Sequence, residues 1–299
     1  MTEEFHIDKL YAALDQLSPE VIADHHAWPC ALALTIIHHF LGAEWIAEHI
    51  RPDAASAGSI LRWRASDPGE LAIQTYRIVD LGESLLNLRH LAGFSDCVTR
   101  MLSSPNPEFG LAELHIGKML FINGWDFCFI VPQGIAGKDY DFGIDYYGHA
   151  LAGETKCRVE ALDEPSSKVI TNILHDHRKQ LPPDGPGIFF IKIPQSWMKS
   201  SDWERTSVMG ALDFFAEGTG RVVSVVFYLE PLYWRDGIMA QGHRFKEVLN
   251  PRRRHGKDVD WKLFERWRPL PGAMNTMPPK WTRLIDFPKG IFSWKIETE

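Results

Sequence analysis

The sequence predicts an α/β fold, with an α-helical N-terminal region followed by a mixed sheet flanked by helices. Two observations support this prediction. Over roughly the first hundred residues of the 299-residue chain, apolar side chains recur at helical intervals. After the proline-containing stretch 103–107, short segments rich in aromatic and β-branched residues alternate with helical ones. Such a stretch ends helices, so we place a boundary there, after an N-terminal helical module of residues 1–104.

The composition is that of a globular protein. Hydrophobic residues make up 45% of the chain and charged residues 24%, enough of each to bury a core and keep a polar surface. The longest apolar stretch, 31–41, is interrupted by His38 and His39, and a membrane span needs roughly 20 residues, so no membrane association is expected. The acidic N-terminus is unlike a signal peptide, and the four cysteines are widely spread. We therefore expect a cytoplasmic protein without structural zinc.

Two long helices are predicted in the N-terminal module. Ser18 and Pro19 suit the N-cap and first position of a helix that continues to about residue 49. A second helix is predicted over 82–102, where the apolar residues form one side. Between them, 51–69 mixes Pro, Ser, Gly and Asp and is expected to be mainly a loop.

The second part begins with a helix and a β-hairpin. The helix is predicted over 107–122 and ends near Asn123 and Gly124, as a left-handed C-cap would. A strand over 125–131 follows, and strands over 140–146 and 150–159 join tightly around Gly148 and His149. The remaining predicted elements are helices over 166–181 and 208–216 and strands over 187–193 and 222–229. Together these elements would form a core domain over residues 105–240.

Asp141, Glu154 and Lys156 form the most informative group in this core. Side chains alternate along a strand, so Glu154 and Lys156 emerge on the same face, and a tight hairpin can bring Asp141 beside them. Two neighbouring carboxylates repel each other unless a cation lies between them. Oxygen ligands select Mg²⁺ or Mn²⁺ over zinc. Such a cation activates water and polarises a phosphate, and a nearby ammonium stabilises the added negative charge, as phosphodiester hydrolysis requires.

The order of these elements resembles the PD-(D/E)XK nuclease superfamily, which has a restriction-endonuclease-like fold. The resemblance covers about residues 108–195, roughly a third of the chain. It implies that Asp141 and Glu154 bind the metal ion, that Thr155 offers its main-chain carbonyl, and that Lys156 is catalytic. Glu113, on the helix before the hairpin, matches the acidic residue that many members carry there. It would hold a water on the metal ion or a second ion.

Three further positions bear on the resemblance. Members often carry a basic or amide side chain on the helix after the hairpin, for which Lys179 and Gln180 are candidates. Tyr140 stands where the family name has proline, a position that varies widely. Gly143 stands where some members have a further acid, which would leave one metal ion rather than two.

The C-terminal region is the predicted nucleic-acid surface. The net charge of the chain is −7, yet residues 250–299 contain 11 Lys and Arg against 6 Asp and Glu. Its densest basic run, proposed to contact phosphates, comprises Arg252, Arg253, Arg254 and Lys257. The tryptophans Trp261, Trp267, Trp281 and Trp294 either stack on bases or, the reading we favour, anchor a C-terminal extension (241–299) onto the core.

The favoured function is that of a Mg²⁺-dependent nuclease, with DNA preferred over RNA on the usual preference of the family. The helical module could choose the target, form a homodimer or sense a partner. Two alternatives remain: a non-catalytic nucleic-acid-binding or assembly protein that kept the fold, and an enzyme acting on another phosphorylated substrate. The complete set of two acids and a lysine favours catalysis. The histidine pairs His25–His26 and His38–His39 point to different faces of their helices, so they are not expected to bind zinc.

Overall fold

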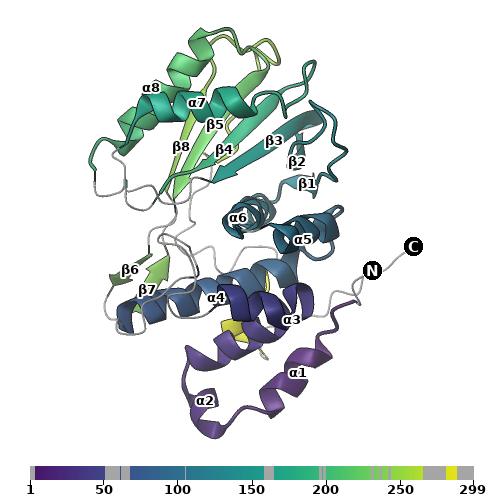
Figure 1. The fold of residues 1–299 in the computed structure, drawn as a ribbon. Helices are drawn as coiled ribbons and strands as arrows, with labels where there is room; N and C mark the ends of the chain where they lie inside the picture. Colours follow the sequence, from purple (N-terminus) through teal and green to yellow (C-terminus); the bar gives the residue numbers. More distant parts are fainter. Residues whose placement is uncertain are drawn as a thin grey trace. The chain divides into compact units, whose positions relative to one another are not determined.

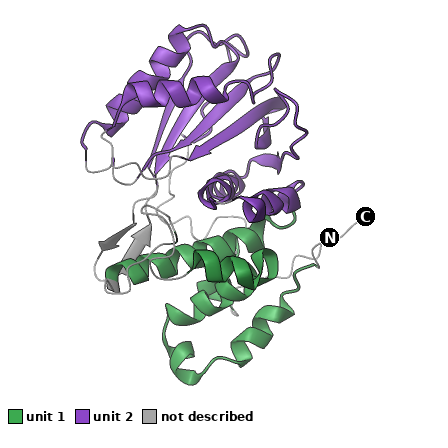
Figure 2. Cartoon of the chain, in the orientation of Figure 1, with its two compact units in different colours: residues 1–56, 60–90, 270–299 green, residues 57–59, 91–269 purple. Residues whose placement is uncertain are grey.

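The structure, a computed structural model, describes residues 4–50, 61, 68–104, 106–157, 165–194, 197, 200–229, 232–235, 238–241, 244–264 and 281–287 (Figure 1). The chain divides into two compact units, which Figure 2 colours separately. Unit 1 comprises residues 1–56, 60–90 and 270–299, and unit 2 comprises 57–59 and 91–269. The predicted α/β class, with a mixed sheet flanked by helices and a helical N-terminal region, is confirmed.

Unit 1 is helical. Its elements are α1 (Asp8–Asp15), α2 (Pro19–Ala23), α3 (Ala27–His49), α4 (Pro68–Leu88) and the 3-10 helix η3 (Leu284–Asp286). The N-cap at Ser18 is present, with its hydroxyl 3.5 Å from the amide of Val21. The prediction of one helix from there to about residue 49 is wrong, because α2 ends at Ala23 and α3 begins at Ala27. By length and composition α3 could cross a membrane; in this unit its residues Leu32, Ile36 and Ile37 are fully buried.

The C-terminal segment 281–287 belongs to unit 1 and is held by α4. The indole of Trp281 and the amide of Leu284 donate to the carboxylate of Glu83, at 3.1 and 2.8 Å, and Asn87 bonds the main chain of Thr282. Trp281 therefore anchors this segment to a helix of unit 1. Trp267 and Trp294 lie outside the described residues.

The prediction of a single helix over 82–102 is wrong. Helix α4 ends at Leu88, and α5 (Phe94–Ser103) begins after Gly93. Gly93 has a φ of 77°, and a Cβ there would lie 1.9 Å from the carbonyl oxygen of Phe129. The amide of Phe129 donates to the carbonyl of Ala92 at 2.9 Å. The break is therefore set by a close approach of two main chains in unit 2, which the apolar spacing does not reveal.

Gly93→Ala is expected to lower the free energy of unfolding of unit 2 by about 3 kcal/mol or more, since a positive φ and a main-chain clash are combined. Urea unfolding would measure the loss. Gly124→Ala is the matched control, because Gly124 also has a positive φ but nothing within 4 Å of a Cβ. Equal losses in the two variants would contradict the role given to the Phe129 carbonyl.

Unit 2 is built on a six-stranded mixed sheet with the order β1-β2-β3-β4-β5-β8. The strands are β1 (Asp126–Phe129), β2 (Phe142–Tyr146), β3 (His149–Cys157), β4 (Gly187–Lys192), β5 (Val222–Leu229) and β8 (Arg244–Leu249). The β3–β4 and β4–β5 pairs are parallel and the others antiparallel. A separate hairpin consists of β6 (Leu232–Arg235) and β7 (Ile238–Gln241). Since β8 extends this sheet, residues 244–249 are part of the core fold rather than of an added extension.

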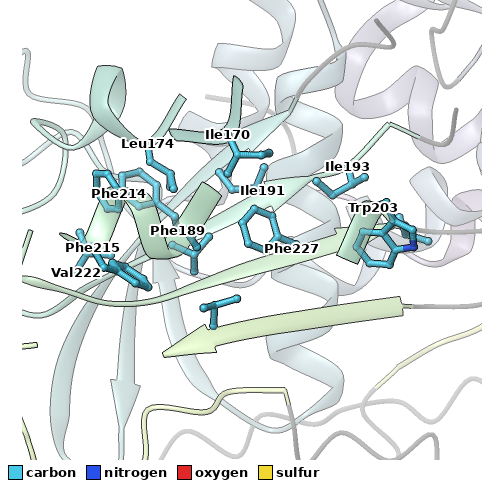
Figure 3. Close-up of a cluster of buried hydrophobic side chains, with 14 of the residues drawn as sticks. Ile170, Leu174, Phe189, Ile191, Ile193, Trp203, Phe214, Phe215, Val222 and Phe227 are labelled. Atoms are coloured by element: carbon cyan, nitrogen blue, oxygen red, sulfur yellow. The ribbon is translucent and has the colours of Figure 1, made fainter. Parts of the chain in front are cut away.

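Helices cover both faces of the sheet. The crossover helices α7 (Ser167–His177) and α8 (Trp203–Ala216) pack against each other on one face (Figure 1). The apolar cluster of Figure 3 includes residues of α7, α8, β4 and β5, among them Leu174, Phe214, Phe189, Ile191 and Phe227. On the opposite face α6 (Glu108–Ile122) packs against β3, and His115 stacks on Tyr228 of β5 with ring centroids 5.3 Å apart. The strands between these helices are buried on both faces, as parallel strands are.

Candidate active site

The β2–β3 hairpin sets the position of Asp141. Its two-residue turn, Tyr147 and Gly148, has φ values of 51° and 84°, which suit a type I′ turn and fix the register. Phe142 then pairs with Gly153, and Asp141, just before β2, donates its amide to the Gly153 carbonyl at 2.9 Å. The amide of Thr155 donates to Asp141 Oδ2 at 2.6 Å. The structure thus brings Asp141 beside the Glu154–Lys156 segment.

Glu154 and Lys156 lie on the face of the sheet covered by α7. They pair in parallel register with Phe189 and Ile191, two residues of the cluster under α7 and α8. Glu154 has no exposed surface, and Lys156 Nζ lies 2.5 Å from its Oε1. Neither carboxylate oxygen has a hydrogen bond of regular geometry within the described ranges of the chain. Burial raises the pKa of Glu154 to about 7, although the charge of Lys156 opposes the rise.

The pKa of Asp141 is also raised, well above its usual value. Burial is the main cause, and the neighbouring charges of Glu154 and Glu113 add to it. Lys156 and the Thr155 amide act in the opposite direction. Two neighbouring carboxyl groups whose pKa values are both raised resist ionisation. A cation bound between them would favour the ionised form of both.

Glu113 is paired with Arg100, a residue that the sequence did not single out. Arg100 Nη2 on α5 lies 2.6 Å from Glu113 Oε2 on α6, and Nη1 donates to the carbonyl of Ile130 at 3.2 Å. Within α5 the residues around Arg100 are those of an ordinary amphipathic helix. No sequence signal marks Arg100, because its partner is brought in by the packing of α5 on α6.

The end of α7 carries a histidine within electrostatic reach of Lys156. Burial lowers the pKa of His177, and the positive charge of Lys156 lowers it further. His177 Nδ1 lies 2.9 Å from Oε1 of Gln180. Gln180 is half-buried, whereas Lys179 is exposed to solvent. Of the two candidates after the hairpin, Gln180 is therefore the one joined to a residue near Lys156.

The donor set fits a divalent cation with a preference for oxygen. Among the residues that the structure describes, no group of three His, Cys, Asp or Glu side chains is arranged to hold a metal ion. Asp141 and the fully buried Glu154 nevertheless supply hard oxygen donors, and Glu154 lacks regular hydrogen bonds. Mg²⁺ sites often use one or two carboxylates, with water and substrate phosphate as the remaining ligands. Asp141, Glu154 and the main-chain carbonyl of Thr155 could hold such an ion.

The basic run is not brought to this site. The register places Lys156 in line with Ile191, Phe227 and Lys246, whereas Leu249, which precedes the run, pairs with Ser224 near the other end of β5.

Each of the three arginines in the run makes a hydrogen bond with the main chain of a nearby residue. Arg252 donates to the carbonyl of Ala216 at 2.7 Å, Arg253 donates to that of Lys257 at 3.0 Å, and the amide of Arg254 donates to Gly220. Trp261 is buried and bonds the carbonyl of Gly256 at 3.1 Å, so it anchors this segment.

Comparisons of the chain with protein-family models, curated proteins and solved structures found no match. Function is therefore inferred from the geometry of the site.

Proposed function

We propose that this chain is a Mg²⁺-dependent nuclease with a site of the PD-(D/E)XK type on a restriction-endonuclease-like core, acting on DNA in preference to RNA. The observation that carries the proposal is the fully buried carboxylate of Glu154, with Lys156 Nζ 2.5 Å from it and Asp141 held beside it by the Thr155 amide. The α6–β1–β2–β3–α7–β4 order around this group is the one that the resemblance implies.

Each residue has a defined task in this proposal. Asp141 and Glu154 would hold the cation, which when bound supplies Lewis-acid activation of the phosphodiester and of a water. The Thr155 amide orients the Asp141 carboxylate through its 2.6 Å hydrogen bond. Lys156 stabilises the negative charge that grows on the phosphate in the transition state. Gln180, hydrogen-bonded to His177, lies just beyond the end of α7, the helix that covers the same face, and could orient a water or a phosphate oxygen.

The pair of Asp141 and the buried Glu154 favours catalysis over a purely binding role. Keeping two carboxyl groups in a site that raises both of their pKa values destabilises the fold at neutral pH. A protein that only bound nucleic acid would gain nothing from this arrangement, since phosphate contacts come from exposed cations.

The test is cleavage of nucleic acid by the purified full-length chain. We expect cleavage of double-stranded DNA with Mg²⁺ or Mn²⁺ and none with EDTA. Supercoiled and linear DNA, single-stranded DNA and RNA would be compared in parallel, because cleavage of a closed circle identifies an endonuclease. Failure to cut any of these substrates with either metal would overturn the proposal.

A further inference from the structure

The guanidinium of Arg100 connects three elements around the candidate site. It lies on α5, pairs with Glu113 of α6 at 2.6 Å, and donates to the carbonyl of Ile130 just after β1 at 3.2 Å. The amide of Ile130 in turn donates to the carbonyl of Asp141 at 2.9 Å. Arg100 is thus two hydrogen bonds away from the main chain that carries one of the proposed metal ligands.

The ion pair between Arg100 and Glu113 is largely buried, and its arginine stays positively charged. The side chains are 27% and 11% exposed. A guanidinium does not lose its proton in proteins, so Arg100 keeps its positive charge beside Glu113. Glu113 Oε2 is therefore committed to Arg100 rather than open to an incoming cation.

The net charge of the groups near the site suits one divalent cation rather than two. When all are ionised, Glu113, Asp141 and Glu154 contribute three negative charges, and Arg100 and Lys156 contribute two positive charges. Glu113 influences the ionisation of both other acids, and Arg100 that of Glu154, so these groups act on one another. One divalent ion turns a balance of −1 into +1, and a second would add two more positive charges in a buried site, which is unfavourable.

We infer that Arg100 takes the place of a second divalent cation at Glu113, so that the site holds a single ion between Asp141 and Glu154. The inference rests on the proposed function and makes it more specific. Arg100 is then a positioning residue: it neutralises Glu113 and holds the end of β1 against the strand that begins after Asp141. Glu113 acts through Arg100 and is not itself a metal ligand.

The inference is tested by counting bound Mn²⁺ ions in the absence of substrate, from the electron paramagnetic resonance signal of the free ion. We expect the unaltered chain to bind one Mn²⁺. Arg100→Met frees Glu113 and adds one net negative charge, so it should bind two. The double variant Arg100→Met/Glu113→Gln removes both charges together. It should bind one ion with an affinity within about threefold of the unaltered chain, because the charges of a close pair largely cancel at a distance.

Arg205→Met, an exposed arginine on α8, is the matched control and should leave the count at one. Two ions in the unaltered chain, or one in a folded Arg100→Met variant, would overturn the inference while leaving the nuclease proposal intact. Should Arg100→Met fail to fold, the double variant decides: an affinity lowered more than about tenfold would make Glu113 a ligand. An unaltered chain that binds no Mn²⁺ and cuts no nucleic acid would overturn both.

Discussion

Lys156→Met is expected to lower the rate of Mg²⁺-dependent cleavage by about a thousandfold, the upper end of what loss of one transition-state donor produces. The Lys156 side chain is 18% exposed and its Nζ lies 2.5 Å from Glu154 Oε1, so little bulk water can replace its charge where the phosphate would bind. Methionine keeps the length of the side chain but brings no charge. Single-turnover cleavage at saturating Mg²⁺ would measure the loss.

Lys168→Met, on the exposed side of α7, is the matched control and is expected to leave the rate within about twofold. Mn²⁺ binding separates catalysis from folding, because Asp141 and Glu154 remain in the Lys156 variant and should still bind the ion. A Lys156→Met protein that cuts at the unaltered rate would remove Lys156 from the mechanism.

The placement of Asp141, Glu154 and Lys156 could be predicted from the sequence where local rules apply. The two-fold alternation of a strand places Glu154 and Lys156 on one face, and the Gly148 turn fixes which residue of β2 meets Gly153. The strand β5 (Val222–Leu229) has the bounds predicted from its apolar run, because a strand buried on both faces needs apolar residues throughout.

Features that depend on packing between distant segments could not be predicted. Arg100 meets Glu113 only because α5 packs on α6, and α5 is a separate helix only because Gly93 passes close to Phe129. The strand β8 (Arg244–Leu249) carries charged residues on an edge of the sheet and becomes a strand by pairing with β5. The same pairing directs the chain from Leu249 toward Ser224, so the arginine run begins near the end of β5 remote from Lys156.

Glu154→Gln is expected to abolish cleavage and to stabilise the protein at alkaline pH. The pKa of Glu154 is raised from 4.5 to about 7, chiefly by burial, with Lys156 only partly offsetting it. Between these two values the unfolded chain has released the proton and the folded chain retains it. The stability that the protonated group contributes is therefore fully present below pH 4.5 and is lost as the pH rises through about 7. A shift of this size corresponds to about 3 kcal/mol for a fully buried group.

Glutamine has no acidic proton, so the variant does not lose stability in this way as the pH rises. In EDTA at pH 8 its free energy of unfolding should exceed that of the unaltered chain by about 2–3 kcal/mol, and at pH 5 the difference should fall below about 1 kcal/mol. The pKa of Asp141, raised in part by Glu154, should fall in the variant, which acts in the same direction. Urea unfolding at the two pH values measures both differences, and Glu204→Gln, at an exposed position of α8, should change neither.

Magnesium should reverse this order of stability. In the proposed site the cation would bind the ionised carboxylates, so it should stabilise the unaltered chain at pH 8 by an amount that grows with its concentration and leave Glu154→Gln nearly unchanged. Binding of the ion would then offset the free-energy cost of ionising the buried Glu154. This result is expected if Glu154 serves to bind the ion and not to stabilise the fold. If Glu154→Gln is less stable than the unaltered chain at pH 8 in EDTA, the pair with Lys156 outweighs burial. Glu154 would then be a structural residue.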